Sequence, residues 1–318
     1  MTVCTLITTI DLKERSFQIL KRTILLICFI KKHKDFTLII SIGHINYFFK
    51  KIIELFISDN IELIKSSEYN FKTINNSFLR NKALHKVKTE YAVIVDIDIY
   101  VNNEFLNFIR EKIDIKSKFD MLPCFYLRDN VFFISKKYHL IYKDFLTYKR
   151  KYVLHVAMPS SVILFRIKSA LKIGGFNEAY EGNGYEDFDF ITRLCLHENI
   201  ITISEAWLID LPYDAPLLSK GFRSYLAQLC LENFLQCNFV VHIYHKKGAF
   251  YKRNREKNAR IYINFLSNWI TNNQYIVNKK YSEVDLILYF FNLCEKLNFN
   301  PNEYFCLFDA RPRYIIKK

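Results

Sequence analysis

The chain has 318 residues, 51% of them hydrophobic, so it can bury a substantial core in one large domain or two smaller ones. Its 46 Lys and Arg residues exceed 32 acids, and the net charge of +14 favours an anionic partner: a nucleotide, a nucleic acid or a membrane surface. Eight scattered cysteines without a CxxC, and no N-terminal apolar run long enough to span a bilayer, indicate a cytoplasmic protein rather than a disulfide scaffold or a secreted chain.

The first hundred residues alternate between strand and helix patterns. Strands are expected at 3–9, 36–42, 61–64 and 91–95, and helices at 19–30, 48–57 and 77–88, the last one capped by Ser77. This alternation indicates a parallel, doubly wound sheet, in which ligands bind beyond the carboxyl ends of the strands. Thr9, Asp11 and Arg15 are therefore candidates for donor binding. No GxGxxG or Walker A pattern follows these strands, so a nucleotide would be held in another way.

The alternation weakens after residue 98. Helices are expected at 105–113, 138–148, 167–173 and 186–197, and strands at 121–127, 131–134, 161–166 and 239–244. A basic segment covers 246–260, and a helical extension ends in a basic tail at 311–318. We therefore expect a nucleotide-binding half at 1–120, an acceptor-binding and catalytic half at 121–260, and a helical extension at 261–318.

Two aspartates follow the apolar fourth strand directly. Asp96 and Asp98 stand at positions i and i+2, whose side chains point to the same side of an extended backbone. Two like charges held together need a cation or hydrogen-bond donors, and a divalent ion such as Mn²⁺ or Mg²⁺ that also binds phosphate would supply this. A solvated loop with two acids is the simpler alternative.

The helix before that strand contains Arg80 and Asn81. An arginine at this place can bind a pyrophosphate, and a neighbouring amide can fix a ribose or a base. An exposed helix face without a ligand is the other interpretation.

Residues 174–190, GGFNEAYEGNGYEDFDF, hold four of the seven glycines and four carboxylates. The pair Glu186 and Asp187 follows the glycine loop and starts a helix, where a carboxylate can be held rigidly for general-base work on a hydroxyl. Helix capping by acids would explain one or two of these carboxylates, but not the glycines.

Two histidines lie at the end of the strand expected at 239–244, one within it and one directly after it. His242 and His245 point to opposite faces of an extended strand, so one of them is expected to join a metal site at Asp98. A strand histidine satisfied by ordinary hydrogen bonds is the alternative.

The order of these features over residues 3–255 resembles the GT-A fold of inverting, family 2-like glycosyltransferases. More narrowly, the segment at 174–190 is similar to the C-terminal motif of the galactosyltransferase family that includes β-1,4-galactosyltransferases and bacterial chondroitin-type capsule polymerases. The resemblance implies an α/β protein with a Rossmann-like nucleotide-binding sheet, a mixed-sheet acceptor-binding half and a helical C-terminal extension.

The resemblance also implies roles for individual residues. It places Arg80 and Asn81 at the donor with the diphosphate on Arg80, Asp96 at the ribose, and the metal on Asp98 with His245 or His242, preferably His245. Asp187 becomes the base, and Glu186 is the second catalytic acid. The acceptor is expected to be bound by residues of the glycine loop and the following helix: Gly184, Tyr185 and Asp189. Asn183 stands where the family has tryptophan, so Tyr185 is expected to supply the aromatic surface, with Tyr180, Trp207 and Tyr213 as further stacking candidates.

The implied reaction is an inverting, metal-dependent transfer of a hexose or N-acetylhexosamine from a UDP-sugar to a glycan hydroxyl. The expected acceptor is a bacterial surface glycan, capsule or lipooligosaccharide, either free or lipid-linked. The basic C-terminal segments are expected to contact the inner membrane. A nucleotidyltransferase is an alternative, but residues 8–15 lack a glycine-rich phosphate loop. A nucleic-acid-binding protein is another, and it leaves residues 182–189 unexplained.

Overall fold

A computed structural model describes residues 2–13, 16–129, 134–211, 215–246, 254–273 and 285–308. The chain forms two compact units, each built from several segments. The first unit contains residues 1–120, 161–202 and 246–264, and the second contains residues 121–160, 203–245 and 265–318. The division expected from the sequence separates a donor half, an acceptor half and an extension by their expected roles, and it stays a prediction.

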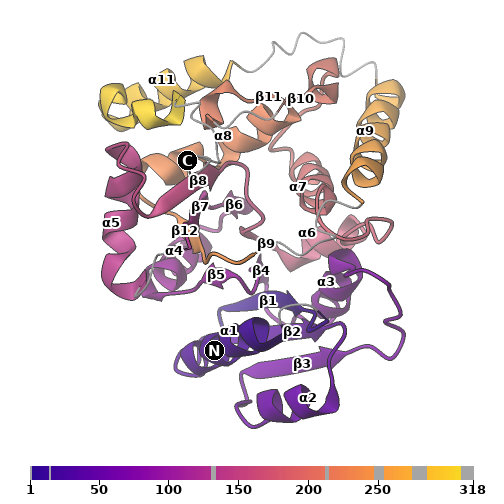
Figure 1. Ribbon diagram of the computed structural model, residues 1–318. Coiled ribbons are helices and arrows are strands. Elements are labelled where there is room, and N and C mark those ends of the chain that lie inside the picture. Colours follow the sequence, from indigo (N-terminus) through magenta and orange to yellow (C-terminus); the bar gives the residue numbers. More distant parts are fainter. Residues whose placement is uncertain are drawn as a thin grey trace, which may run out of the picture. The chain divides into compact units, whose positions relative to one another are not determined.

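A six-stranded sheet organises the first unit (Figure 1). Its strand order is β3-β2-β1-β4-β9-β6. The strands are β1 (Cys4–Ile10), β2 (Phe36–Ile42), β3 (Ile61–Lys65), β4 (Tyr91–Ile94), β9 (Ile163–Arg166) and β6 (Phe119–Met121). β1 pairs in parallel with β2 and β4, β2 pairs in parallel with β3, and β9 runs antiparallel to β4. The expected parallel sheet is therefore the first part of a mixed sheet.

The helices of the first unit connect and cover these strands. They are α1 (Ser16–Ile30), α2 (Tyr47–Glu54), α3 (Asn76–Leu84), α4 (Asn103–Asp114), α6 (Ile167–Lys172), α7 (Glu186–His197) and the first part of α9 (Arg255–Asn272). The short strand β5 (Ile99–Tyr100) follows the Asp96–Asp98 loop. Right-handed crossovers from β1 to β2 and from β2 to β3 place α1 and α2 on one face of the sheet, and the reversed step to β4 places α3 on the other.

Asparagine side chains cap three of these helices. Asn46, Asn75 and Asn102 accept hydrogen bonds from the backbone N–H groups of Phe49, Phe78 and Phe105 at the starts of α2, α3 and α4. The expected cap at Ser77 is therefore wrong: Asn75 caps α3, and Ser77 lies inside the first turn of the helix.

A smaller parallel and antiparallel sheet forms the centre of the second unit. β7 (Cys124–Leu127) lies between β12 (Val240–His242), to which it is parallel, and β8 (Val153–Ala157), to which it is antiparallel. Around it lie α5 (Ile134–Leu146), α8 (Phe222–Leu235) and α11 (Leu286–Leu297), the short strands β10 (Asp210–Leu211) and β11 (Lys220–Gly221), and three 3₁₀ helices, Glu205–Leu208, Pro216–Leu218 and Pro301–Phe308. Phe125, Phe145 and Phe234 pack against one another in the core.

The α/β class expected from the sequence is confirmed by this mixture of parallel sheet, antiparallel additions and helices. The strand expected at 131–134 falls largely outside the described residues, and Ile134 begins α5. All eight cysteines are free thiols, six of them buried. Among the helices of the described residues, none is long and apolar enough to cross a bilayer.

Candidate functional site

Arg80 is the centre of a cluster of charged side chains in the first unit. It lies on the buried face of α3, and its Nη1 donates to Asp187 Oδ1 at 2.5 Å while Nη2 donates to Asp96 Oδ1 at 3.0 Å. Glu186 Oε1 lies 4.0 Å from Nη1, and the guanidinium carbon lies 5.0 Å from the centre of the Phe176 ring. One buried cation thus faces three carboxylates, all of which the sequence assigned to the site.

Asp96 is held from two sides at the carboxyl end of β4. Besides Arg80, which binds Oδ1, it accepts a hydrogen bond at Oδ2 from the Ser161 hydroxyl at 2.9 Å. These two bonds fix the plane of the carboxylate, which remains partly exposed. Ser161 comes from the segment just before β9, and nothing in the sequence pointed to it.

The glycine loop turns the chain sharply into α7. Gly182, Gly184 and Tyr185 all have positive φ angles, of 69°, 106° and 72°. The Gly184 N–H donates to Glu186 Oε2 at 2.7 Å, so the loop binds the first carboxylate of the helix that follows. Two glycines in GNG allow this left-handed path, which side chains with a Cβ adopt at a cost in strain.

Asn258 on α9 holds the same loop from outside. Its amide donates to the carbonyl groups of Glu181, at 2.9 Å, and Gly184, at 3.0 Å, and it is fully buried. The Gly182 N–H donates to the Ile74 carbonyl at 2.8 Å. The position of Glu186 and Asp187 is therefore set by contacts with two distant segments.

Burial raises the pKa of two acids of this cluster, Glu186 and Asp187. Desolvation, reinforced by the charge of Asp187 and opposed by Arg80, raises the pKa of Glu186 to about 8. Desolvation also raises the pKa of Asp187, against the pull of Arg80. Burial lowers the pKa of Arg80, but Asp187, Asp96 and Glu186 outweigh it and raise that pKa above its ordinary value. Arg80 thus stays charged, while Glu186 can hold a proton at neutral pH.

Several residues expected at the donor or the acceptor have structural partners instead. Asn81 holds the GGF segment, Gly174–Phe176, and the residues that follow it. Its Oδ1 accepts from the Phe176 N–H at 2.7 Å, and its Nδ2 donates to the Phe176 carbonyl at 2.9 Å and to Glu178 at 2.8 Å. Asp189 is buried and binds Arg193 through Oδ2, at 2.8 and 2.6 Å. Both side chains are thus bonded inside the fold, and a ligand contact by either stays a prediction.

The aromatic side chains expected to stack on a sugar are mostly part of the core. Tyr185 is buried beside Phe188 and Tyr262, and Tyr180 and Trp207 are also buried. Tyr213 lies outside the described residues. The pattern of aromatic residues in the sequence did not show which rings the helices would cover.

A cleft of about 550 Å³ opens at the carboxyl ends of β1, β2 and β3. Its lining includes Gly43, His44, Lys65 and Tyr69. Asp11 holds two of these side chains through Oδ2, with His44 Nδ1 at 2.8 Å and the Tyr69 hydroxyl at 3.3 Å.

Of the other expected donor ligands, Thr9 lies on β1 and donates to the Asn76 side chain at 3.1 Å. Arg15 lies outside the described residues. Of the two side chains that Asp11 holds, His44 follows the end of β2, where ligands of such a sheet are expected. Tyr69 lies in an irregular segment whose sequence has no recognisable pattern, so the sequence did not predict it at the cleft.

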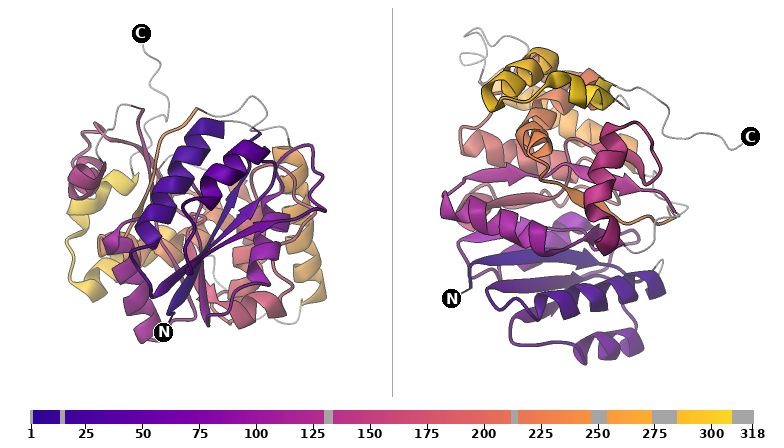
Figure 2. Two further views of the ribbon diagram at one scale, coloured as in Figure 1. Left: turned by 90° about the horizontal axis from the view of Figure 1, so that it is seen from below. Right: turned by 90° about the vertical axis from the view of Figure 1, so that its left-hand side faces the viewer.

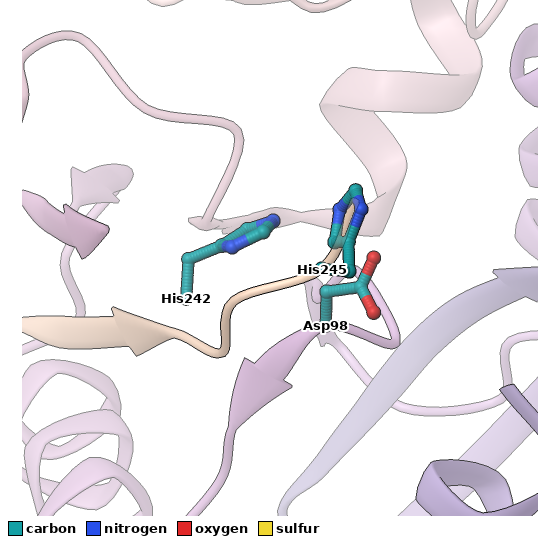
Figure 3. Close-up of side chains that lie close together, drawn as sticks. All are labelled: Asp98, His242 and His245. Carbon is teal, nitrogen blue, oxygen red and sulfur yellow. The ribbon is translucent and has the colours of Figure 1, made fainter. Parts of the chain in front are cut away.

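The expected metal ligands lie in both units. In the first unit, Asp98 is buried and forms an ion pair with Arg22 of α1. In the second unit, His242 ends β12 and His245 follows it, with ring centres 5.1 Å apart and ring nitrogens within 4.8 Å of each other (Figure 3). His242 also stacks on Tyr126 at 4.2 Å. The expectation that the two histidines point apart is wrong, because the chain leaves the strand after His242 and turns.

The model of the family described as glycosyltransferase like family 2 matches residues 5–267. No match is found among curated proteins.

Similar solved structures include the catalytic domain of Drosophila β1,4-galactosyltransferase 7 in complex with xylobiose, at 13% identity and a TM-score of 0.34 over 62% of this chain and 63% of that one. Staphylococcus aureus TarS, residues 1–349, is similar at 17% identity and a TM-score of 0.40 over 62% of this chain and 56% of that one. In both cases less than two thirds of the other chain is covered.

The family match includes the six-stranded sheet, the Arg80 cluster and the glycine loop that carries Glu186 and Asp187. Together with the mixed α/β architecture, this match identifies the fold as GT-A. The chain belongs to the glycosyltransferase like family 2.

Proposed function

We propose that the protein transfers a hexose or an N-acetylhexosamine from a UDP-sugar to a hydroxyl group of a glycan, with inversion at the anomeric carbon. The observation that carries this proposal is the cluster in which Arg80 binds Asp187 and Asp96 with Glu186 beside them. An inverting transfer in one step needs one positioned base for the acceptor hydroxyl and a means of stabilising the departing nucleotide diphosphate.

Asp187 is the base in this scheme. It is partly exposed and hydrogen-bonded to Arg80, whereas Glu186 is almost completely buried. A carboxylate with a raised pKa is a stronger base than an ordinary aspartate, and its contact with Arg80 keeps it ionised. Asp187 can therefore accept the proton as the acceptor oxygen attacks the sugar.

Glu186 has a different role because its pKa is about 8. At neutral pH it is mostly protonated, so it can donate a hydrogen bond to a sugar or to its neighbour while its other oxygen accepts from Gly184. Two adjacent acids whose environments differ in this way can divide base and donor roles between them.

Arg80 acts as a positioning residue in our proposal. The resemblance implied that it binds the nucleotide diphosphate, but its guanidinium is buried and bonded to two carboxylates. A charged, planar donor of this kind holds two acids at fixed angles. Any contact with the diphosphate would need one of these bonds to be exchanged.

The cleft at the ends of β1 to β3 is our candidate for the nucleoside of the donor. Asp11, which the sequence pointed to, fixes His44 and Tyr69 at its wall. Ligands of open α/β sheets bind beyond the carboxyl ends of the strands, which is where this cleft lies. Lys65 adds positive charge at its edge.

A divalent cation, Mn²⁺ or Mg²⁺, is proposed as the cofactor, with Asp98, His245 and His242 as its ligands. The donor types fit: imidazole nitrogen and carboxylate oxygen suit Mn²⁺, and the two imidazoles present nitrogens within 4.8 Å of each other. The ion pair between Arg22 and Asp98 requires the cation to compete with a guanidinium for that carboxylate. When bound, such an ion would offset negative charge on the departing diphosphate.

A bacterial surface glycan, as in capsule or lipooligosaccharide, is our proposed acceptor class, because residues 174–190 resemble the motif of capsule-type transferases. Eight free cysteines support a reducing, cytoplasmic location. Membership of the glycosyltransferase family gives no support to the alternatives of a nucleotidyltransferase or a nucleic-acid-binding protein.

The test is a screen of UDP-sugars for UDP release with and without glycan acceptors, in Mn²⁺, Mg²⁺ and a chelator. We expect release with one or a few UDP-sugars, an inverted anomeric configuration in the product by NMR, and loss of turnover in Asp187→Asn. Wild-type turnover in both Asp187→Asn and Asp98→Ala would refute the assignment of the site. Retention of the anomeric configuration would refute the one-step mechanism.

A further inference from the structure

We propose that the outer surface of α1 and α2 binds an anionic lipid bilayer. This α1–α2 surface is formed by five large hydrophobic side chains and three lysines: Phe17, Leu25, Tyr47, Phe48, Leu55, Lys21, Lys50 and Lys51. The proposal concerns a surface that the transfer reaction does not use, and it stands whichever sugar is transferred.

The hydrophobic side chains of this surface are unusually exposed. The three most exposed large hydrophobic side chains of the described residues are Leu55 at 81%, Phe17 at 78% and Tyr47 at 76%, and Phe48 is exposed by 66%. Single exposed apolar residues are ordinary, but a group of them on neighbouring elements marks an interaction surface.

Helical spacing explains why these side chains share one face. Phe17, Lys21 and Leu25 follow one another at intervals of four residues along α1, whereas Ile19, Ile27 and Ile30 are buried. On α2, Phe48, Lys51 and Leu55 lie on one side, and Phe49 and Ile53 are buried on the other. Each helix therefore presents a mixed apolar and basic stripe.

The two stripes are joined into one surface. The rings of Phe17 and Phe49 meet edge to face with centres 5.3 Å apart, and Phe48 and Phe49 are 6.0 Å apart. The left view in Figure 2 shows α1 and α2 side by side on the same face of the sheet. The starts of both helices, with Phe17, Tyr47 and Phe48, lie at the edge where the parallel strands end.

The charge of this region is complementary to anionic lipid. Residues 16–60 contain six lysines against three acids, Asp35, Glu54 and Asp59. Arg22 adds nothing to this surface, because it is buried with Asp98. Glu54 binds Lys50 and Lys51, at 3.2 and 3.0 Å, and Asp35 binds Arg110. Against the third acid, Asp59, stand four further exposed lysines, Lys21 on α1 and Lys31, Lys32 and Lys34 just after it, so positive charge remains in excess.

The combination of residue types favours a bilayer over a protein partner. The cores of protein interfaces are depleted in lysine, whereas here lysines alternate with phenylalanine, tyrosine and leucine. At a membrane surface, aromatic and leucine side chains enter the boundary between head groups and acyl chains while lysines extend toward anionic head groups.

Vesicle flotation of the full chain tests the proposal. We expect binding to vesicles of phosphatidylglycerol and phosphatidylcholine in equal parts, and little binding to phosphatidylcholine alone. The variant with Phe17→Ser, Tyr47→Ser and Phe48→Ser should lower the partition coefficient by at least about tenfold, because three aromatic side chains no longer enter the boundary. Lys21→Gln should lower it by about fivefold at low salt.

Ile115→Ser is the matched control, since Ile115 is exposed by 70% just after α4 and lies outside the α1–α2 surface. It should bind vesicles as the wild type does. Equal loss in the control and in the triple variant, or binding that is lost only when residues 311–318 are deleted, would overturn the proposal.

A second measurement does not depend on the stability of the triple variant. Tyr47→Trp keeps an aromatic ring at the surface, and its added fluorescence should be quenched by brominated acyl chains in anionic vesicles, whereas that of Ile115→Trp should not. Absence of selective quenching would overturn the proposal. So would a concentration-dependent dimer in ultracentrifugation that the triple substitution dissociates without any vesicle binding, because the surface would then pair two copies of the chain.

Discussion

Arg80 and Asp187 are 107 residues apart in the sequence, and their side chains share a hydrogen bond of 2.5 Å. This bond ties α3 to the first turn of α7 and places the proposed base beside Asp96 at the end of β4. The consequences for activity and stability can be measured separately.

Replacement of the base should abolish most turnover. We expect Asp187→Asn to lower kcat by about 10²- to 10⁴-fold with little change in donor affinity, because a proton acceptor is lost and the shape is kept. Steady-state UDP release measures both constants. Glu181→Gln is the control. It removes an exposed acid of the same loop, paired with Lys257, and should leave kcat within about twofold of the wild-type value, because surface substitutions have small effects.

The pH dependence of the reaction should show the raised pKa of Asp187. Because desolvation raises that pKa, the acidic decline of kcat/KM should lie above the pH of an ordinary aspartate. The profile is measured at saturating metal. A decline centred at or below the ordinary aspartate pKa would contradict the proposed environment of the base.

Removal of the Arg80 charge should destabilise the first unit. Arg80→Met leaves Asp96, Glu186 and Asp187 together without their cation, and breaking such a buried pair costs about 3–5 kcal/mol. Urea unfolding followed by circular dichroism measures the change. The loss should be larger at pH 8 than at pH 5, where the acids can take up protons; a loss independent of pH would point to packing alone.

Glu186 should make wild-type stability fall with rising pH. Its pKa of about 8 in the folded protein is above the ordinary value of 4.5, so the folded state binds more protons between these values. Stability from this group is thus complete below pH 4.5 and lost as the pH rises through 8. Glu186→Gln should make the free energy of unfolding less dependent on pH. The change over this pH range should be up to about a few kcal/mol, as expected for a pKa shift of this size.

Gly174 and Gly175, the glycine pair that follows α6, should differ in their tolerance of a side chain. A Cβ at Gly175 would lie 2.4 Å from Asn81 Oδ1, and the φ of 70° is also unfavourable. Gly175→Ala should therefore destabilise by about 2–3 kcal/mol, and Gly174→Ala, with φ of 80° and open space, by about 1 kcal/mol. Thermal or urea unfolding compares them; equal losses would contradict a role for Asn81 as a clamp.

The dependence of activity on metal should depend on the two histidines at the end of β12, His242 and His245. We expect a chelator to remove transferase activity, Mn²⁺ to restore it, and His245→Ala to raise the Mn²⁺ concentration needed for half activity by at least about tenfold, as for loss of a metal contact. His155→Ala is the control, since His155 stacks on the same Tyr126 ring as His242 but is not among the proposed ligands. Full activity in the chelator would remove the cation from the scheme.

Local patterns predicted much of the fold. The bounds expected for residues 36–42 and 186–197 are those of β2 and α7, because an apolar β-branched run and an acidic helix start are decided by neighbours in the chain. The family resemblance, rather than these local patterns, assigned Arg80, Asp96, Glu186 and Asp187 to one site, and all four lie together in the first unit. Family resemblance of the glycine loop, rather than periodicity, supplied the expected reaction.

By itself, then, the sequence determined the elements, the fold class and the candidate acids, since residue type and spacing are local properties. Only the tertiary structure decided which partner each polar side chain has: Arg80 faces acids, Asn81 clamps the GGF segment, and Tyr185 and Asp189 are buried. It also decided that Phe17 and Tyr47 stay exposed on neighbouring helices. Burial and pKa depend on segments far away in the chain, such as Asp187 for Arg80, 107 residues apart, and no local pattern specifies which segment will cover a given side chain.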